Sequence, residues 1–200
     1  LQALHIGLEH RHDVGVGQAP DVARAERTLR EIIAALTDTS GAEKDTYVRE
    51  LQEKLNELYT AEIAELSFIL EGDFRSENGT YVFDGFLSDD GFIYFRCWLL
   101  LKGKDFFEDI TKDIQSFVSG KYSFNIGDCW GEGLLYVSDE AYSENHDNDD
   151  ESEIRDAVHE RYPDNHYDSM DRQMNREPKE GADLQKMYPK LVKEICELRK

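Results

Sequence analysis

Apolar residues recur at helical spacing through most of the chain, and this pattern constrains the fold more than any other feature. Val48, Leu51, Leu55 and Leu58, for example, form one stripe. Residues three and four apart share a face of a helix, so each stripe predicts one buried helix face. We predict helices over residues 21–36, 46–71, 88–101, 104–118, 128–141, 153–162 and 189–200. The expected fold is mainly α, with about six or seven helices.

Two short segments between these helices carry turn signals. Asn78-Gly79 favours a tight turn and the sequence TYVF after it is β-prone, so we predict a short β-hairpin near residues 74–86. The break before Asp45 and Thr46, either of which can cap the next helix, is also short. We therefore expect the first two predicted helices to form an antiparallel hairpin.

The ends of the predicted domain differ from its middle. Residues 1–20 lack periodicity and contain several glycines, so we expect an N-terminal arm or loop. Residues 21–200 are predicted to form a single, mainly helical domain. Within it, residues 143–183 are acidic and include the low-complexity run SENHDNDDESE, which predicts an irregular, mobile segment. DNDDESE lacks the glycine of an EF-hand loop, and we expect no metal site.

Charge is the strongest compositional signal. The chain has 43 Asp and Glu against 23 Lys and Arg, a formal net charge of −20. Such a chain repels nucleic-acid phosphates and anionic membranes, so we expect neither as a partner. Solubility alone explains many acidic surfaces, and a basic protein partner is the other interpretation.

Cysteine usage and apolar runs indicate the compartment. Cys97, Cys129 and Cys196 are far apart and form no CxxC pair, which is typical of reduced thiols in a cytoplasmic protein. No apolar run approaches the ~20 residues of a membrane span. No phosphate loop or dinucleotide fingerprint occurs, so we expect no cofactor.

The stretch SDDGFIYFRCWLLLKGKDFF holds the candidate site. Asp89 and Asp90 lie at a predicted helix start, where they could bind a divalent cation or act as an acid and base pair. Carboxylates in a first turn also satisfy free N–H groups and suit the positive helix end. Adjacent helical residues point about 100 degrees apart, which makes a shared ligand difficult. We favour the structural role and assign no catalytic residue.

Three further polar or aromatic residues complete the candidate site. Arg96 lies beside the apolar face of this predicted helix, with Tyr94 and Trp98 as neighbours. An arginine in this position pairs with a carboxylate of a neighbouring helix or binds an anionic ligand, and the ion pair is favoured because a lone buried guanidinium is costly. Trp98 is assigned to the core with Phe92 and Phe95.

The motif resembles the signature of a bacterial family, domain of unknown function 4240. Its pattern is SDDGF, one residue, YFR, one residue, WL, then a spacer and a glycine. Ser88 to Phe92, Tyr94 to Arg96, Trp98, Leu99 and Gly103 match it. LQEKLNELYTAEIAELSFIL and MYPKLVKEI resemble flanking family segments, so the resemblance covers about residues 46–193. The spacer EGDFRSENGTYVFDGF is longer than in the family, and the first 40 residues are not covered.

The resemblance implies a small, mostly helical bacterial domain and brings no reaction with it. Our leading hypothesis is a non-enzymatic interaction protein, of immunity or regulatory type, that binds a basic partner such as a toxin domain. The alternative is an enzyme or small-ligand sensor with its site at the SDDGF and YFR residues. An oligomerising module is a third hypothesis, and the oligomeric state is left open.

Overall fold

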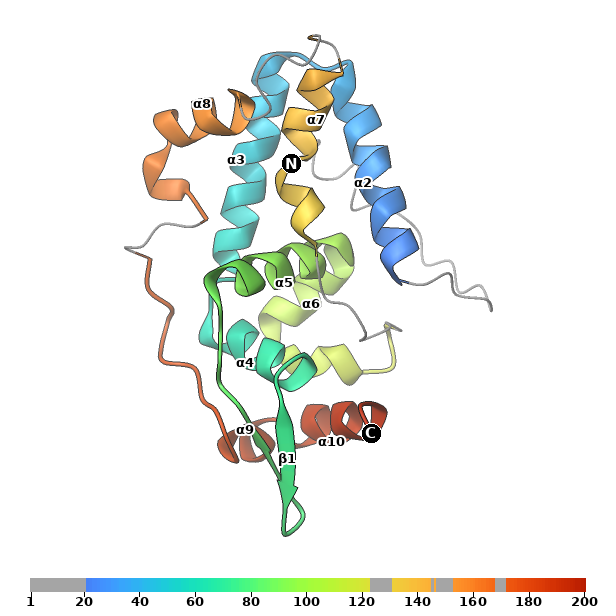
Figure 1. Cartoon of the computed structure of the whole chain (residues 1–200), viewed down its shortest axis with the longest axis vertical. Helices are drawn as coiled ribbons and strands as arrows, with labels where there is room; N and C mark the ends of the chain where they lie inside the picture. The colour runs from blue at the N-terminus through green and yellow to red at the C-terminus, as the bar shows by residue number, and fades with distance from the viewer. Residues whose placement is uncertain (1–20, 123–130, 145, 147–152, 168–171) are drawn as a thin grey trace.

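Helices build nearly all of the ordered structure. The computed structural model describes residues 21–122, 131–144, 146, 153–167 and 172–200 (Figure 1). The α-helices within these residues are α2 (Asp21–Thr37), α3 (Gly41–Glu57), α4 (Ala61–Leu70), α5 (Asp89–Leu101), α6 (Lys104–Lys112), α7 (Val137–Ser143), α8 (Glu153–Arg161), α9 (Asp183–Met187) and α10 (Pro189–Leu198). Short 3-10 helices are η1 (Ile114–Val118), η2 (Glu132–Leu135) and η3 (Pro163–Asn165), and the strands are β1 (Phe74–Glu77) and β2 (Thr80–Phe83). The predicted mainly α class with a short hairpin is confirmed.

The described helices are arranged in an upper and a lower group. Helices α2, α7, α3 and α8 form the upper group, and α5 crosses beneath them above α4, α6 and α10 (Figure 1). The β-hairpin projects from the lower end (Figure 1). Side chains from α2 through α10 contribute to one hydrophobic core. The predicted arm over residues 1–20 lies outside the described residues.

Helix α7 separates the two helices that were expected to pair. The short turn between α2 and α3 is present, but the main contacts of α2 are with α7, which also packs on α3 (Figure 1). Val137 and Ala141 of α7 are buried there. The predicted packed hairpin is therefore wrong, because an element from much later in the chain supplies the apolar surface between its two helices.

The helix predicted over residues 46–71 is divided and begins earlier. Ser40 is the N-cap of α3 and forms a capping box with Glu43, so neither Asp45 nor Thr46 has that role. Thr60 then caps α4, accepting a hydrogen bond from the Ile63 N–H at 3.3 Å. The sequence pattern did not indicate the break between α3 and α4, because the spacing of apolar residues continues through it.

A second predicted helix also changes type before its end. Helix α6 ends at Lys112, and Asp113 caps η1 by accepting from the Gln115 N–H at 2.9 Å. Ile114 and Phe117 are nevertheless buried, as their helical spacing indicated. The apolar face is thus correct although the backbone is not one helix.

The β-hairpin turns at the predicted dipeptide. Asn78 and Gly79 have φ of 51° and 82°, the left-handed values that a two-residue hairpin turn requires. Register pairs Glu77 with Thr80 and Phe74 with Phe83. On the edge of β2 that faces away from β1, Phe83 exchanges two backbone hydrogen bonds with Gly181, at 3.4 and 3.0 Å.

Residues 172–181, which we call the strap, run along the molecule between α8 and α9 (Figure 1). They belong to the acidic segment predicted over residues 143–183, of which residues 145, 147–152 and 168–171 lie outside the described structure. Helix α8 is where a short helix was predicted. The strap is extended, yet it is fixed by specific contacts to α4.

A buried carboxylate anchors the strap. Glu65 of α4 is 0% exposed and accepts hydrogen bonds from both terminal nitrogens of Arg176. It also accepts from the Lys179 N–H and from the Tyr188 hydroxyl, each at 2.6 Å. Arg176 also pairs with Glu62 at 2.8 Å, and a hydrogen bond from Asn175 together with this pair holds the pKa of Glu62 below its usual range. These donors replace the water that Glu65 loses on burial.

Helix α5 is the centre of the core. Residues from Phe92 to Leu100 are buried except Tyr94. The Gly131 N–H donates to the Tyr94 carbonyl at 3.1 Å, so the chain before η2 lies directly against the α5 backbone. A Cβ on Gly131 would lie 2.4 Å from the backbone nitrogen of Trp98. Only glycine permits this approach.

Glu65→Gln should destabilise the protein far more than Glu62→Gln. Loss of the buried negative charge leaves the Arg176 guanidinium without its inner partner, which should lower the free energy of unfolding by about 3 kcal/mol. Glu62 is 38% exposed, so its change should cost less than about 1 kcal/mol. Urea denaturation followed by circular dichroism measures both, and equal losses would contradict the anchoring role.

Gly131→Ala should lower the free energy of unfolding by about 2–3 kcal/mol, because the new methyl group forces the α5 backbone away. Gly41→Ala is the matched control, since nothing lies within 4 Å of a Cβ there. It should be neutral or slightly stabilising in α3. Thermal unfolding of the two variants compares them, and a neutral Gly131→Ala would exclude the close approach.

Candidate functional site

The first turn of α5 presents the two predicted aspartates to solvent. Ser88 is the N-cap and accepts from the Gly91 N–H at 3.1 Å. Asp89 and Asp90 occupy the first turn and are exposed. The capping bond therefore belongs to Ser88, and the two carboxylates add negative charge at the positive end of the helix.

Asp90 lies near a cluster built on Tyr94. The hydroxyls of Tyr94 and Tyr136 both donate to Oε1 of Glu132, each at 3.0 Å. This hydrogen bond, with burial and the nearby carboxylates of Glu132 and Asp90, raises the pKa of Tyr94 to about 12. Arg155 lies over the Tyr136 ring, 4.8 Å from its centroid. Tyr94, Glu132 and Tyr136, which we call the Glu132 cluster, join α5 to η2 and to the start of α7.

Arg96 is buried inside the core and does not line an open cleft. Only 1% of it is exposed. Its Nη1 donates to the Leu55 carbonyl at 2.9 Å, and its Nε donates to the Phe92 carbonyl at 3.3 Å. The guanidinium lies over the rings of Tyr59 and Phe92, at 5.1 and 4.8 Å. Leu55 is in the last turn of α3, where a cation suits the negative helix end. A carboxylate partner for Arg96 stays a prediction.

Trp98 and Cys97 are core residues. The Trp98 ring stacks on Phe95 with centroids 5.7 Å apart, and Lys102 Nζ lies 4.3 Å from its centroid. Burial raises the pKa of the Cys97 thiol to about 12, so the nucleophilic thiolate is disfavoured. The buried members of the motif therefore build the helix core.

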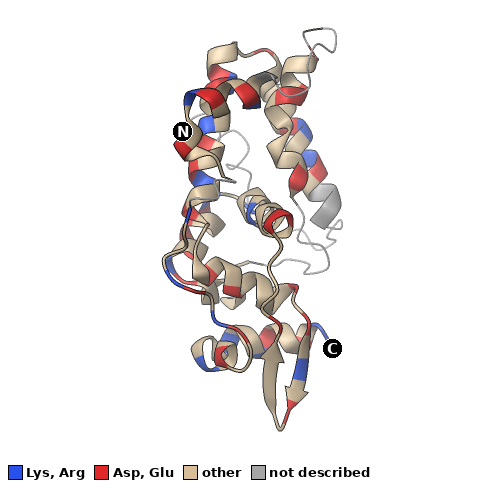
Figure 2. Ribbon diagram, turned by 60° about the vertical axis from the view of Figure 1, so that its left-hand side comes forward, with Lys and Arg blue, Asp and Glu red and all other residues tan. Residues whose placement is uncertain are grey.

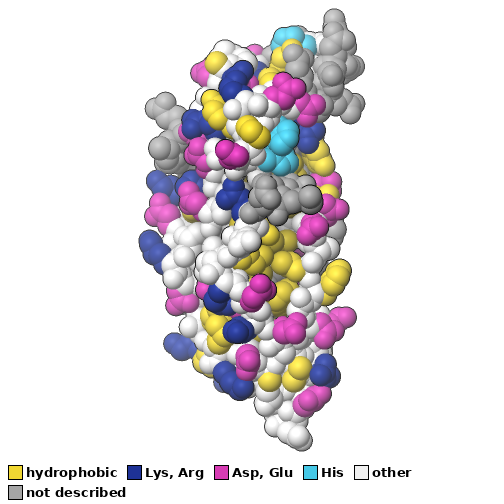
Figure 3. Space-filling view, turned by 90° about the vertical axis from the view of Figure 1, so that its left-hand side faces the viewer, with side chains coloured by type: hydrophobic (Ala, Val, Ile, Leu, Met, Phe, Trp, Pro, Cys, Tyr) yellow, Lys and Arg dark blue, Asp and Glu magenta, His cyan; other side chains and the backbone are white. Residues whose placement is uncertain are grey.

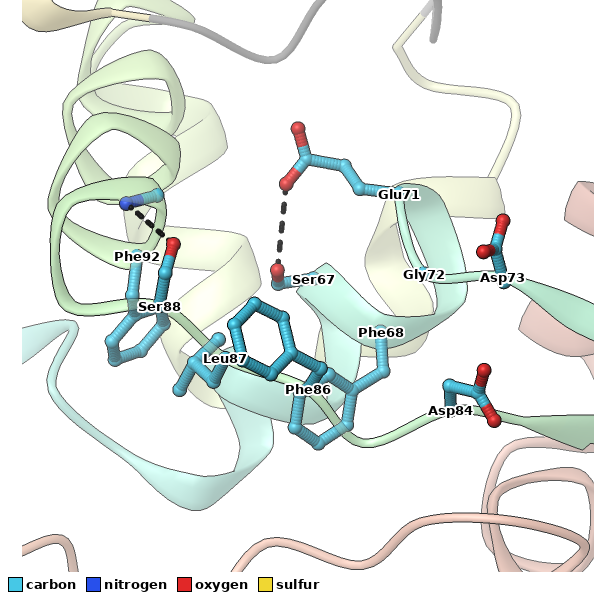
Figure 4. A pocket seen from close by; sticks show the side chains of 11 residues that line it. Ser67, Phe68, Glu71, Gly72, Asp73, Asp84, Phe86, Leu87, Ser88 and Phe92 are labelled. Atoms are coloured by element: carbon cyan, nitrogen blue, oxygen red, sulfur yellow. Dashed lines mark hydrogen bonds between the residues drawn. The ribbon is translucent and has the colours of Figure 1, made fainter.

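An open pocket of about 300 Å³ lies beside the start of α5, and we call it the α5 pocket (Figure 4). It is lined by Ser67, Phe68 and residues 71–73 at the end of α4, by Asp84 and residues 86–88 after the hairpin, and by Gly91 and Phe92 of α5. Figure 4 shows Asp73 and Asp84 on the hairpin side and Ser88 and Phe92 on the α5 side. The pocket thus joins the first part of the sequence motif to the hairpin.

The α5 pocket has acidic groups and an exposed aromatic ring. Glu71, Asp73 and Asp84 are lining residues, and none of the described lining residues is Lys or Arg. The Asp84 N–H donates to the Asp73 carbonyl at 2.9 Å, which holds the two residues together at the base of the hairpin. Phe86 is 83% exposed. The arrangement favours a cationic group that also has apolar surface.

The structure separates the predicted site residues into different environments. Asp89 and Asp90 are at the surface, Tyr94 is half-buried in the Glu132 cluster, and Arg96 and Trp98 are in the core. They do not converge on one site.

Sequence reasoning missed the pocket residues Glu71, Asp73, Asp84 and Phe86, and also missed Glu132. Asp73 and Asp84 flank the predicted hairpin, and this placement could have indicated that their carboxylates lie close together. Cys129 lies outside the described residues.

The described residues contain neither a membrane-spanning helix nor a cluster of metal-binding side chains. No helix there combines the length and apolar character needed to cross a membrane. No group of three or more His, Cys, Asp or Glu side chains in the same residues is placed to hold a metal ion.

A family model described as "Protein of unknown function (DUF4240)" matches residues 23–144, which is more than half of the chain. The chain belongs to the DUF4240 family. No curated protein matches the chain, and no solved structure matches it. The matched region begins and ends earlier in the chain than the resemblance expected over residues 46–193. It includes most of α2 and ends just after α7.

The DUF4240 region contains the whole α5 pocket, the Glu132 cluster and the motif. The strap, α9 and α10 follow it. Glu180 of the strap nevertheless packs on Gly85 beside the pocket, where a Cβ would lie 2.1 Å from its Oε2. The surroundings of the pocket therefore include residues beyond the match.

The pKa of Tyr94 should be measurable and should depend on Glu132. Its ordinary value is 10.0 and its value in the folded chain is about 12. The stabilisation from the Tyr94 hydroxyl should be complete below pH 10.0 and lost as the pH rises toward 12. Carbon-13 NMR of the tyrosine rings should show the Tyr94 pKa falling in Glu132→Gln. An unchanged pKa in that variant would contradict this cause.

Proposed function

We propose that this protein is a non-enzymatic interaction protein that binds a basic protein partner, and that the α5 pocket is the centre of the binding surface. The observation that carries the proposal is the combination of three carboxylates and an exposed phenylalanine in one pocket. The role of this protein is of immunity or regulatory type, with a basic partner such as a toxin domain.

Charge supports a basic partner. The formal net charge of −20 attracts positive surfaces and speeds their approach. Acidic positions are spread along the whole length of the molecule, with basic positions between them (Figure 2). On the face carrying α8 and the strap, charges of both signs are interspersed (Figure 3). Long-range attraction is therefore general, and a local feature has to fix the partner's position.

The α5 pocket supplies such a feature. Interfaces gain most of their binding energy from a few aromatic and charged residues near their centre. Phe86 is the most exposed of the large hydrophobic side chains in the described structure, and it lines the same pocket as Asp84. A partner that covers Phe86 removes its ring from water, while Glu71, Asp73 and Asp84 attract the partner's basic groups.

The environment of the motif favours binding over catalysis. Arg96 donates to carbonyl oxygens and lies over aromatic rings, and the raised pKa of Cys97 keeps its thiol protonated. Tyr94 is held by Glu132 in its neutral form. We also propose a cytoplasmic location, which the buried free thiols of Cys97 and Cys196 support.

A small-ligand sensor is the second candidate, because the α5 pocket borders Ser88, Gly91 and Phe92 of the motif. Its volume of about 300 Å³ lies at the lower end of the range for small-molecule sites. A free guanidinium compound that raises Tm as much as a basic peptide does would favour this candidate.

Binding to basic peptides tests the interaction function. A fluorescent peptide rich in Lys and Arg should bind at low ionic strength, and its association rate should fall by about tenfold or more at high salt. Fluorescence anisotropy and stopped-flow mixing measure both. A neutral peptide of the same length is the control, and equal binding of the two peptides would exclude electrostatic recognition.

A further inference from the structure

The α5 pocket presents negative charge to an incoming cation. Asp73 and Asp84 form no salt bridge with any described residue. Arg75 interacts with Asp84 electrostatically, but its direct partner is Glu77. The positive end of α5 also borders the pocket, but Asp89 and Asp90 place two negative charges there. The local balance therefore favours a positive group.

The turn after α4, which contributes to the pocket, already binds an arginine of this chain. Arg199 donates to the carbonyls of Ile69 and Gly72, at 2.9 and 2.8 Å. Its guanidinium lies over the Phe74 ring, 4.9 Å from the centroid. The carboxyl end of α4 thus binds a guanidinium through oxygen acceptors and an aromatic face.

The pocket side has the same two kinds of partner. Carboxylate oxygens of Glu71, Asp73 and Asp84 replace the carbonyls as acceptors, and Phe86 replaces Phe74 as the aromatic surface. Because Phe86 is 83% exposed, its ring is accessible to a group from another molecule.

We propose that the α5 pocket binds the side chain of an arginine residue presented by the basic partner. This inference rests on the proposed interaction function and adds the group that the partner must present. The guanidinium lies against Phe86, and its N–H groups donate to the pocket carboxylates.

Arginine fits this pocket better than lysine for two physical reasons. Its planar guanidinium stacks on an aromatic ring and donates to two carboxylate oxygens at once. It is also more weakly hydrated than an ammonium group, so less is lost when the partner covers it. The ammonium group of lysine supplies the positive charge, but it does not stack flat on the ring or donate to two carboxylate oxygens as a planar fork.

The test compares three peptides that differ at one position. A lysine-rich peptide carries Arg, Lys or the neutral isostere citrulline at its centre, and binding is measured by fluorescence anisotropy. The unaltered protein should bind the Arg peptide about tenfold more tightly than the Lys peptide, and the citrulline peptide most weakly. Amide shifts of Gly72, Gly85 and Gly91 in NMR spectra should report binding at the pocket.

Phe86→Ala and Asp84→Asn should each remove the preference for Arg over Lys. Phe86 is too exposed for its loss to disturb the fold. Tyr162→Ala and Asp38→Asn are matched controls that change another exposed aromatic and another exposed acid, and both should keep the preference.

The outcomes separate the inference from the function beneath it. Equal binding of the Arg and Lys peptides, or a preference that survives Phe86→Ala and Asp84→Asn, overturns the arginine inference and leaves the interaction function standing. Failure of all three lysine-rich peptides to bind at low salt overturns both. Binding with shifts elsewhere on the protein places the basic surface outside the α5 pocket and also overturns the inference.

Discussion

The hydrogen bonds to the Glu65 carboxylate determine how the lower half of this protein is assembled. A buried carboxylate is stable only when donors replace its water, and three residues from two segments supply them here. Arg176 and Lys179 fix the strap, and Tyr188 fixes the start of α10. Because the strap then pairs with β2 through Gly181, the position of the hairpin depends on the same carboxylate. One charge thus connects α4, the strap, α10 and the base of the α5 pocket.

Most of the fold follows from local sequence patterns. The hairpin turn was predictable because Asn78 and Gly79 tolerate left-handed backbone, and the start of α5 because Ser88 is a strong cap. The break at Thr60 was not, because the apolar stripe continues across it. The insertion of α7 between α2 and α3 depends on contacts between residues far apart in sequence, which periodicity does not encode. Ser40 and Glu43 form a capping box, which is a stronger helix start than the predicted caps Asp45 and Thr46 offer.

The candidate site was only partly predictable, for a similar reason. Patterns within α5 located Asp89, Asp90 and Arg96, but they could not show which segments from elsewhere in the chain lie against each of these residues. Glu132 contacts Tyr94 across a long sequence separation. The α5 pocket is formed where the ends of two helices and a hairpin meet, so no single segment of the sequence carries its signature. Asp73 and Asp84 become neighbours only after the hairpin has paired.

Because the strap packs on α4, the cooperative folding unit of this protein extends beyond the region that matches the family. The family match ends at residue 144, yet the donors that make Glu65 tolerable in the interior come from residues 176, 179 and 188. A chain shortened to the matched region would keep the acceptor and lose every one of these donors, and it would also uncover the apolar face of α4 that α10 protects. The segment that folds as one body is therefore longer than the segment that matches the family.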